Sequence, residues 1–317
     1  MKVRGLIELI TIIGSGMVGT AAASFIAIKE LDDIILIDVV KGLPQGHALD
    51  LSHAASILGL HVSIKGSNDF RDMKGSDLVL VTAGSPRKPG MTREELVVKN
   101  AGIVVNVADN ILRYASDSTV ILTTNPLDAM TYLMFRRLKF PRNRVIGFSG
   151  VLDAGRLKYY AAKKLGISTD GISAMVLGQH GEKMFPVPRL SMIYGKPLTE
   201  FLTREEVEEV IRETLESGAK ITRLRGFSSN YAPGAGLALM AEAIKKDEKK
   251  VLLASVYLDG EYGFRDVVAG VPVVLGKDGA ERIIEVPLTK EEKAKFMESI
   301  RAIRENISQI PRKFLED

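Results

Sequence analysis

The sequence predicts an α/β protein in which a doubly wound parallel sheet is followed by a second unit of helices and antiparallel strands. Apolar, β-branched segments alternate with segments of helical spacing up to residue 147, and a glycine-rich turn joins the first strand to the first helix. Beyond residue 150, neighbouring strand candidates are joined by short turns. A chain of 317 residues suits two domains, which we place at residues 1–147 and 148–317.

The first strand, at residues 9–13, runs into Gly14-Ser15-Gly16-Met17-Val18-Gly19, and the strand at 34–38 ends in Asp38. In this order the glycines allow a tight turn, close approach of a pyrophosphate and close helix packing, and the helix N-terminus favours the phosphate. A carboxylate at Asp38 accepts from a ribose 2′-OH and repels a 2′-phosphate. A tight turn alone would explain the glycines. The flanking strand, helix and acid favour a Rossmann-type site that prefers NAD to NADP.

Composition excludes several classes of function. The 43 basic and 39 acidic residues give a net charge of +4 that is spread along the chain, so nucleic acid is not implied as a partner. The absence of cysteine excludes disulfides, thiolate metal sites and a cysteine nucleophile, and favours an intracellular protein. The amino terminus imitates a signal peptide, but Glu8 interrupts its apolar region, which favours a first strand. No apolar run approaches the ~18 residues of a membrane span.

The first half continues the alternation of strands and helices. We expect a helix at 44–55, a short strand at 61–65, and a buried strand at 77–84 that ends in Thr82-Ala83-Gly84. Ligands bind outside the carboxyl ends of such strands. Residues 85–93 contain two prolines, a glycine and three cations, which predicts a loop that either faces water or meets an anion. A helix at 96–114, a strand at 120–124, a helix from Asp128 and a strand at 144–147 complete six strands.

The second half does not continue the regular alternation of strands and helices. A helix opening at 151 and running through 165 carries Asp153 and Arg156 one turn apart, where a surface ion pair is the alternative to a functional role. A strand at 173–177 runs into Gly178-Gln179-His180-Gly181-Glu182. Capping boxes at Thr203 and Thr289 begin two long helices. Strands at 251–257, 267–275 and 282–286 predict an antiparallel meander.

Of the four histidines, only His180 lies between glycines at a strand end, where an imidazole can face a cleft. His47, His53 and His61 stand at no metal-ligand spacing from it or from one another, so we predict no metal site. His180 is the candidate acid–base group, Asp153 a carboxylate that could fix its tautomer, and Arg156 a guanidinium for a substrate carboxylate.

The chain resembles the lactate and malate dehydrogenases, and most closely the lactate-dehydrogenase-like malate dehydrogenases, over essentially its whole length. Five motifs in the same order carry the resemblance: Gly14-Ser15-Gly16-Met17-Val18-Gly19, the segment from Pro86 to Arg93, Thr124-Asn125-Pro126, the segment from Val151 to Arg156, and Gly178-Gln179-His180-Gly181-Glu182.

The resemblance implies roles at matching positions. His180 would take the hydroxyl proton, and Asp153 would orient it and stabilise its charged form. Arg156 would hold the C1 carboxylate of the substrate, Arg93 would polarise the carbonyl with help from Asn125, and Ser229 would line the pocket. NAD is the implied cofactor, held by Gly14, Gly16, Met17, Gly19, Asp38, Thr82, Ala83, Gly84, Asn100 and Asn125.

Arg87 decides the expected substrate. A second guanidinium complements the C4 carboxylate of malate or oxaloacetate, and the lactate enzymes that this chain resembles usually carry glutamine there. The resemblance therefore implies a cytoplasmic NAD-dependent malate dehydrogenase of the tricarboxylic acid cycle, active on a small dicarboxylate as a homodimer or homotetramer. The alternatives are a lactate or other 2-hydroxyacid dehydrogenase and a non-catalytic NAD-binding sensor. Gln179 and Glu182 differ from the residues that many members of this family have at these positions. The resemblance therefore does not predict the geometry of the loop around His180.

Overall fold

The structure, a computed structural model, describes residues 9–86 and 90–315, with the side chain of Arg93 left out. Its strands are β1 Leu9–Ile13, β2 Asp33–Ile37, β3 Ile64–Ser67, β4 Leu78–Val81, β5 Thr119–Leu122, β6 Val145–Gly147, β7 Ile172–Ser173, β8 Val176–Gly178, β9 Met184–Pro186, β10 Met192–Ile193, β11 Lys196–Pro197, β12 Lys250–Asp259, β13 Arg265–Gly276 and β14 Gly279–Ile283. Its α-helices are α1 Met17–Ile28, α2 Leu43–Leu58, α3 Arg93–Tyr114, α4 Leu127–Leu138, α5 Gly150–Leu165, α6 Arg204–Arg225, α7 Tyr231–Lys245, α8 Lys290–Ser308 and α9 Arg312–Leu315.

The first six strands form the predicted doubly wound parallel sheet. Their order is β3-β2-β1-β4-β5-β6, and every neighbouring pair among them is parallel. The order reverses between β1 and β4, where the glycine turn follows β1. The carboxyl ends of these two strands therefore border a crevice of the kind in which open α/β sheets bind ligands.

Side chains of the parallel strands alternate between two cores. Ile10 and Ile12 of β1 pack with α1 and α7 on one face, whereas Leu9 and Ile13 pack with α3 and α4 on the other. Burial on both faces explains why these strands are almost wholly apolar. The core that contains α1 and α7 also takes in β12, β13 and α8, so one continuous apolar cluster joins the two halves of the chain.

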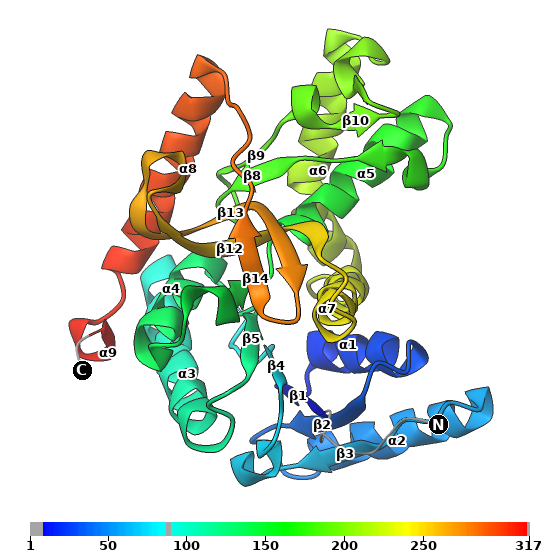
Figure 1. Cartoon of the computed structure of the whole chain (residues 1–317), viewed down its shortest axis with the longest axis vertical. Coiled ribbons are helices and arrows are strands. Elements are labelled where there is room, and N and C mark those ends of the chain that lie inside the picture. The colour runs from blue at the N-terminus through cyan, green and yellow to red at the C-terminus, as the bar shows by residue number, and fades with distance from the viewer. Residues whose placement is uncertain (1–8, 87–89, 316–317) are drawn as a thin grey trace.

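The second half adds the predicted antiparallel strands. β12, β13 and β14 form a meander, and β13 also pairs with β8, which pairs with β9. A contact between Ser255 of β12 and Gly147 of β6 makes this layer continuous with the parallel strands, giving an 11-stranded sheet in the described residues. Figure 1 shows the meander above the first half, with α7 lying against α1 where the halves meet. The predicted fold class is confirmed.

Several predicted bounds were wrong, most clearly for three strands. The strand expected at 61–65 is β3, Ile64–Ser67, because Glu30 accepts from His61 N and Asp33 accepts from Ser63 N before the ladder begins. The strand expected at 282–286 starts at Gly279, directly after a two-residue turn. The single strand expected at 173–177 is split into β7 and β8, since the N–H of Met175 donates to Ser191 Oγ instead of a neighbouring strand.

Arg93 was placed in the loop at 85–93 but is the first residue of α3. Thr92 Oγ1 accepts from Glu95 N at 3.1 Å and Glu95 Oε2 accepts from Thr92 N at 2.8 Å, which is a complete capping box. Helices α7 and α9 and strands β9 to β11 were not predicted. None of the helices in the described part of the chain combines the length and the apolar character that crossing a membrane requires.

Candidate active site

The glycine turn between β1 and α1 has room for a ligand at one of its glycines only. Gly14 has φ +103°, and a Cβ there would lie 2.6 Å from Ala83 N. Gly19 faces the backbone of Gly14 and Thr82 Oγ1, so it packs the helix onto the strand. At Gly16, by contrast, a Cβ would meet no atom within 4 Å. The space beside Gly16 therefore suits the close approach of a pyrophosphate.

A cavity of about 510 Å³ lies at this end of the sheet. Six of the predicted cofactor residues line it: Gly14, Gly16, Asp38, Thr82, Ala83 and Gly84. Further lining comes from α3 through Lys99, Gly102, Ile103, Asn106 and Val107, none of which we had predicted. The cavity combines an apolar wall with a glycine turn, whose N–H groups can donate hydrogen bonds, and a carboxylate, which can accept them. A dinucleotide needs this combination of groups.

Asp38 is held in place at the rim of this cavity by two backbone donors. Its Oδ2 accepts from Ser15 N at 2.7 Å, and its Oδ1 accepts from Val40 N at 3.0 Å. These bonds tie the carboxylate to the glycine turn and to the end of β2. Asp38 therefore presents its carboxylate to the cavity in one fixed orientation.

Asn100 and Met17 lie differently from the glycines. The Asn100 side chain is 1% exposed, and its amide bonds the backbone of Ser85 in both directions and donates to Asn125 O at 2.6 Å. Asn100 thus joins the loop after β4 to the segment after β5. Met17 begins α1 and is exposed.

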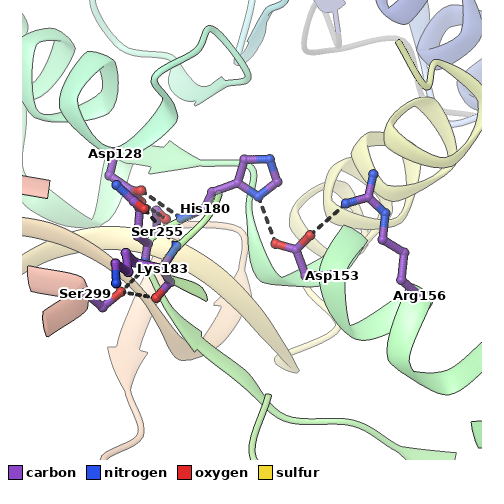
Figure 2. Close-up of polar contacts among 8 residues, drawn as sticks. Asp128, Asp153, Arg156, His180, Lys183, Ser255 and Ser299 are labelled. Carbon is purple, nitrogen blue, oxygen red and sulfur yellow. Dashed lines mark hydrogen bonds and ion pairs between the residues drawn. The ribbon is translucent and has the colours of Figure 1, made fainter. Parts of the chain in front are cut away.

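The second half contributes three charged or titratable residues joined by hydrogen bonds, with a buried carboxylate at the centre. Asp153, in the first turn of α5, is 1% exposed. His180 Nδ1 lies 2.8 Å from Asp153 Oδ2, and Arg156 Nη1 donates to Asp153 Oδ1 at 3.1 Å. Figure 2 shows the carboxylate between the imidazole and the guanidinium. The pair at positions 153 and 156 is therefore not a surface ion pair.

This arrangement fixes the tautomer of His180. An ionised carboxylate only accepts hydrogen bonds, so the proton of a neutral imidazole lies on Nδ1 and the lone pair lies on Nε2. Burial lowers the pKa of His180, but the charge and hydrogen bond of Asp153, followed by the charge of Asp128, raise it by more, so the net pKa lies above its usual value. The Arg156 charge opposes this rise. The imidazole can thus exchange one proton at Nε2.

Buried polar groups hold the loop around His180 (Figure 2). Asp128 Oδ2 accepts from His180 N at 2.8 Å. Ser299 Oγ of α8 accepts from Gln179 N at 2.5 Å and donates to Lys183 O at 2.7 Å. Gln179 Oε1 accepts from Lys183 N at 3.1 Å, which closes the turn. The glutamine that departs from many relatives is therefore part of the loop's own support.

The sequence did not identify Asp128, Ser255 or Ser299 as functional candidates. Asp128 was predicted only as the start of a helix, and Ser255 Oγ donates to its Oδ1 at 2.6 Å. The one available signal was the position of Asp128, two residues after the Asn125-Pro126 motif. No local pattern indicates which distant backbone a buried carboxylate will meet.

The remaining predicted residues are placed only in part. Arg87 lies outside the described residues, and the structure describes no side chain for Arg93. Asn125 is exposed and Ser229 is half-buried, two residues before α7. Neither is hydrogen-bonded to His180, Asp153 or Arg156 in the part of the chain that the structure describes. Across residues 9–86 and 90–315, no group of three or more His, Cys, Asp or Glu side chains could hold a metal ion.

Two family models match the chain. The lactate/malate dehydrogenase NAD-binding domain matches residues 9–147, and the lactate/malate dehydrogenase alpha/beta C-terminal domain matches residues 150–313. A malate dehydrogenase of Caldivirga maquilingensis is 60% identical over 309 residues, which cover 97% of this chain and 100% of that protein. The structure of the malate dehydrogenase from Aeropyrum pernix has a TM-score of 0.94 at 54% identity, covering 97% of this chain and 100% of that one. A lactate dehydrogenase from Eimeria maxima, crystallised with NADH and oxamate, has a TM-score of 0.92 at 35% identity, covering 95% and 93%.

Proposed function

The chain belongs to the lactate/malate dehydrogenase family of oxidoreductases, as its five motifs predicted, and we propose that it interconverts (S)-malate and oxaloacetate with NAD as cofactor. The observation that carries this proposal is the hydrogen-bonded trio of His180, Asp153 and Arg156 around the buried carboxylate of Asp153. It supplies a proton-exchanging group, a carboxylate that fixes its tautomer and a cation for a substrate carboxylate. A protein that only sensed NAD would need no general base.

The trio is linked to the cofactor cavity through a short run of residues. Thr124 Oγ1 donates to Ala83 O, and Ala83 lines the cavity. Asp128, four positions after Thr124, accepts from the backbone of His180. The segment from Thr124 to Asp128 therefore connects the crevice of the parallel sheet to the histidine of the second half.

The residues around the cavity fit a nicotinamide dinucleotide. The open space at Gly16 suits the pyrophosphate, and the fixed carboxylate of Asp38 suits a ribose diol and opposes a 2′-phosphate. We therefore propose NAD rather than NADP. A nicotinamide bound here would supply the hydride acceptor for C2 of the hydroxy acid and, in its reduced form, the hydride donor for the keto acid.

His180 performs the proton transfer in this proposal. Its Nε2 takes the hydroxyl proton during oxidation and gives it back during reduction. Asp153 stabilises the imidazolium that forms and keeps the ring in one orientation. Because the side chain of His180 is only 18% exposed, bulk water competes little for this proton.

Arginines and polar side chains would position the substrate. Arg156 has five N–H donors, of which Asp153 takes one, so the guanidinium retains donors for the C1 carboxylate. Arg93 and Asn125 would polarise the C2 oxygen, and Ser229 would line the pocket. Arg87 would pair with the C4 carboxylate and so select the dicarboxylate.

A single assay distinguishes this proposal from its rivals. We expect the protein to oxidise NADH rapidly with oxaloacetate, slowly with pyruvate, and slowly with oxaloacetate when NADPH replaces NADH. The measurement is the loss of absorbance of the reduced cofactor. Faster turnover with pyruvate than with oxaloacetate would indicate a lactate-type enzyme. If NADH is oxidised with neither acid, the non-catalytic NAD-binding sensor would be the remaining alternative.

We also propose that the protein assembles as a homodimer or homotetramer. The support is a group of exposed apolar side chains on α2, namely Leu49, Ile57 and Leu58, with 60%, 85% and 61% of their surface accessible. Large apolar side chains that stay exposed in the single chain can be covered at an interface between copies. Sedimentation equilibrium should give a mass of two or four chains, and a mass of one chain would contradict the proposal.

A further inference from the structure

We propose that Asp128 is a positioning residue for His180, which fixes the backbone of the histidine and, when ionised, stabilises the imidazolium. The inference rests on the proposed acid–base role of His180. It adds a second carboxylate to the one that contacts the ring.

Asp128 joins three elements that are distant in the sequence. It lies in the first turn of α4, is 3% exposed, and accepts one hydrogen bond at each carboxylate oxygen. Oδ2 accepts from His180 N at 2.8 Å, and Oδ1 accepts from Ser255 Oγ of β12 at 2.6 Å. Figure 2 shows the two bonds side by side. With both oxygens engaged, the carboxylate has one orientation, and the backbone of His180 is held to it.

A carboxylate is an expensive way to satisfy one backbone N–H. Burying its charge costs free energy that a neutral acceptor such as asparagine would avoid. Burial raises the pKa of Asp128 to about 6, while the hydrogen bonds from Ser255 and His180 N act to lower it. The carboxyl is therefore mostly ionised at neutral pH, and its charge acts on the neighbouring imidazole.

Among the residues that the structure describes, the charges that act on His180 are those of Asp128, Asp153 and Arg156. α5 contributes Asp153, whose charge favours the imidazolium, and Arg156, whose charge opposes it. β12 and α8 present the uncharged Ser255 and Ser299 to this network. The Lys183 ammonium is exposed and lies 3.9 Å from Glu298. Removing the charge of Asp128 should therefore lower the pKa of His180.

Asp128→Asn tests the charge while keeping the hydrogen bonds. The amide oxygen can accept from His180 N, and the amide nitrogen can donate to Ser255 Oγ. We expect the inflection in a plot of kcat/KM against pH to move to lower pH, both for malate oxidation and for oxaloacetate reduction. Oxaloacetate reduction, which needs the imidazolium, should then be lost at a lower pH than in the wild type. Because a neutral amide oxygen accepts the hydrogen bond from His180 N more weakly than a carboxylate does, kcat should also fall by about tenfold to a hundredfold.

Two further variants separate charge from support. Ser299→Ala is the matched control, because it removes an uncharged anchor of the same loop. It should lower kcat without moving the inflection. Ser255→Ala removes one donor from Asp128, so the carboxyl should stay protonated to higher pH and the inflection should move as in D128N, but less. S255A also decides the matter if D128N does not fold.

The titration of His180 by ¹³C NMR in histidine-labelled, cofactor-free protein provides a readout that does not depend on turnover, with H180N used to assign the signal. We expect a lower pKa in D128N and S255A, and the wild-type pKa in S299A. Wild-type inflections and a wild-type NMR titration in D128N and S255A would overturn the proposal and leave Asp128 a structural anchor only. A wild-type protein inactive on oxaloacetate would instead refute the proposed function.

Discussion

His180 is held by two carboxylates that act on different atoms of the same residue. Asp153 meets the ring at Nδ1, and Asp128 meets the backbone N–H. The ring orientation and the backbone position are therefore set independently, by α5 and by α4. A substitution of the side chain can remove the imidazole without releasing the loop.

His180→Asn makes use of this independence. Asparagine keeps the backbone N–H that Asp128 accepts but has no group that titrates near neutral pH, so we expect kcat to fall by roughly a hundredfold to ten-thousandfold. NADH affinity, followed by fluorescence titration, should stay close to that of the wild type, since none of the residues that line the cofactor cavity changes. His61→Asn, at an exposed position, is the control that should keep full activity. Full activity in H180N would show that His180 does not transfer the proton.

Arg87→Gln tests the choice of substrate. Without the second guanidinium, the C4 carboxylate of oxaloacetate loses its partner, and pyruvate no longer leaves a cation desolvated and unmatched. We expect the ratio of kcat/KM for oxaloacetate to that for pyruvate to fall by about thirtyfold or more, the equivalent of roughly 2 kcal/mol or more. Lys88→Gln, which removes the adjacent cation, should leave the ratio unchanged. If R87Q also leaves it unchanged, another residue selects the substrate.

At the scale of single elements, the glycines of the turn between β1 and α1 have different roles, one in cofactor binding and one in folding. Gly16→Ala adds a methyl group to open space beside the cavity, so the fold should tolerate it while NADH binding weakens by about tenfold or more. Substrate preference should not change. Gly19→Ala is the contrast, because its Cβ would collide with the Gly14 backbone and should lower the melting temperature. NADH titration and thermal melts would distinguish the two, and a loss of substrate discrimination in G16A would contradict this division of roles.

The elements that the sequence predicted well are those whose signal is local. The parallel strands follow from β-branched runs buried on both faces, and the helices beginning after Thr203 and Thr289 follow from capping boxes. The same rule applied to Thr92 and Glu95 would have placed the start of α3 correctly. β3 was shifted because side-chain acceptors, not a strand partner, take the N–H groups of His61 and Ser63.

The network around His180 could not be predicted in the same way. Asp128 is 52 positions from the residue whose N–H it accepts, and Ser299 is 120 positions from Gln179. Which buried oxygen meets which backbone depends on how α4, α8 and β8 pack, and no residue pattern in any of the three carries that information. His180, Asp153 and Arg156 were candidates from their local sequence, and the resemblance to a family implied their roles. The residues that support them were found only in the structure.

At the scale of the whole molecule, the seam between α1 and α7 brings the cofactor cavity and the catalytic trio into one body. Lys29 of the first half bonds Glu242 of α7 at 2.6 Å. Lys245, at the end of α7, is 8% exposed and pairs with Asp32 at 2.6 Å and with Asp77. Nearer the start of the two helices, Gly234 of α7 packs closely against Ala21 and Ala22 of α1. Because the glycine turn begins α1, any separation of the two helices should also disturb the cofactor cavity.

Gly234→Ala tests that coupling. A Cβ at position 234 would lie 2.7 Å from Ala21 Cβ and 2.9 Å from Ala22 N, so α7 must move away from α1. We expect a loss of about 1–3 kcal/mol of stability, measured by chemical denaturation, together with weaker NADH binding. Gly46→Ala, an exposed helix position where a Cβ meets no atom within 4 Å, is the control and should be neutral or slightly stabilising. Saturating NADH should restore part of the lost stability, because NADH binding favours the arrangement in which α7 packs closely against α1. Destabilisation with wild-type NADH affinity would show that the seam supports the fold without positioning the cofactor site.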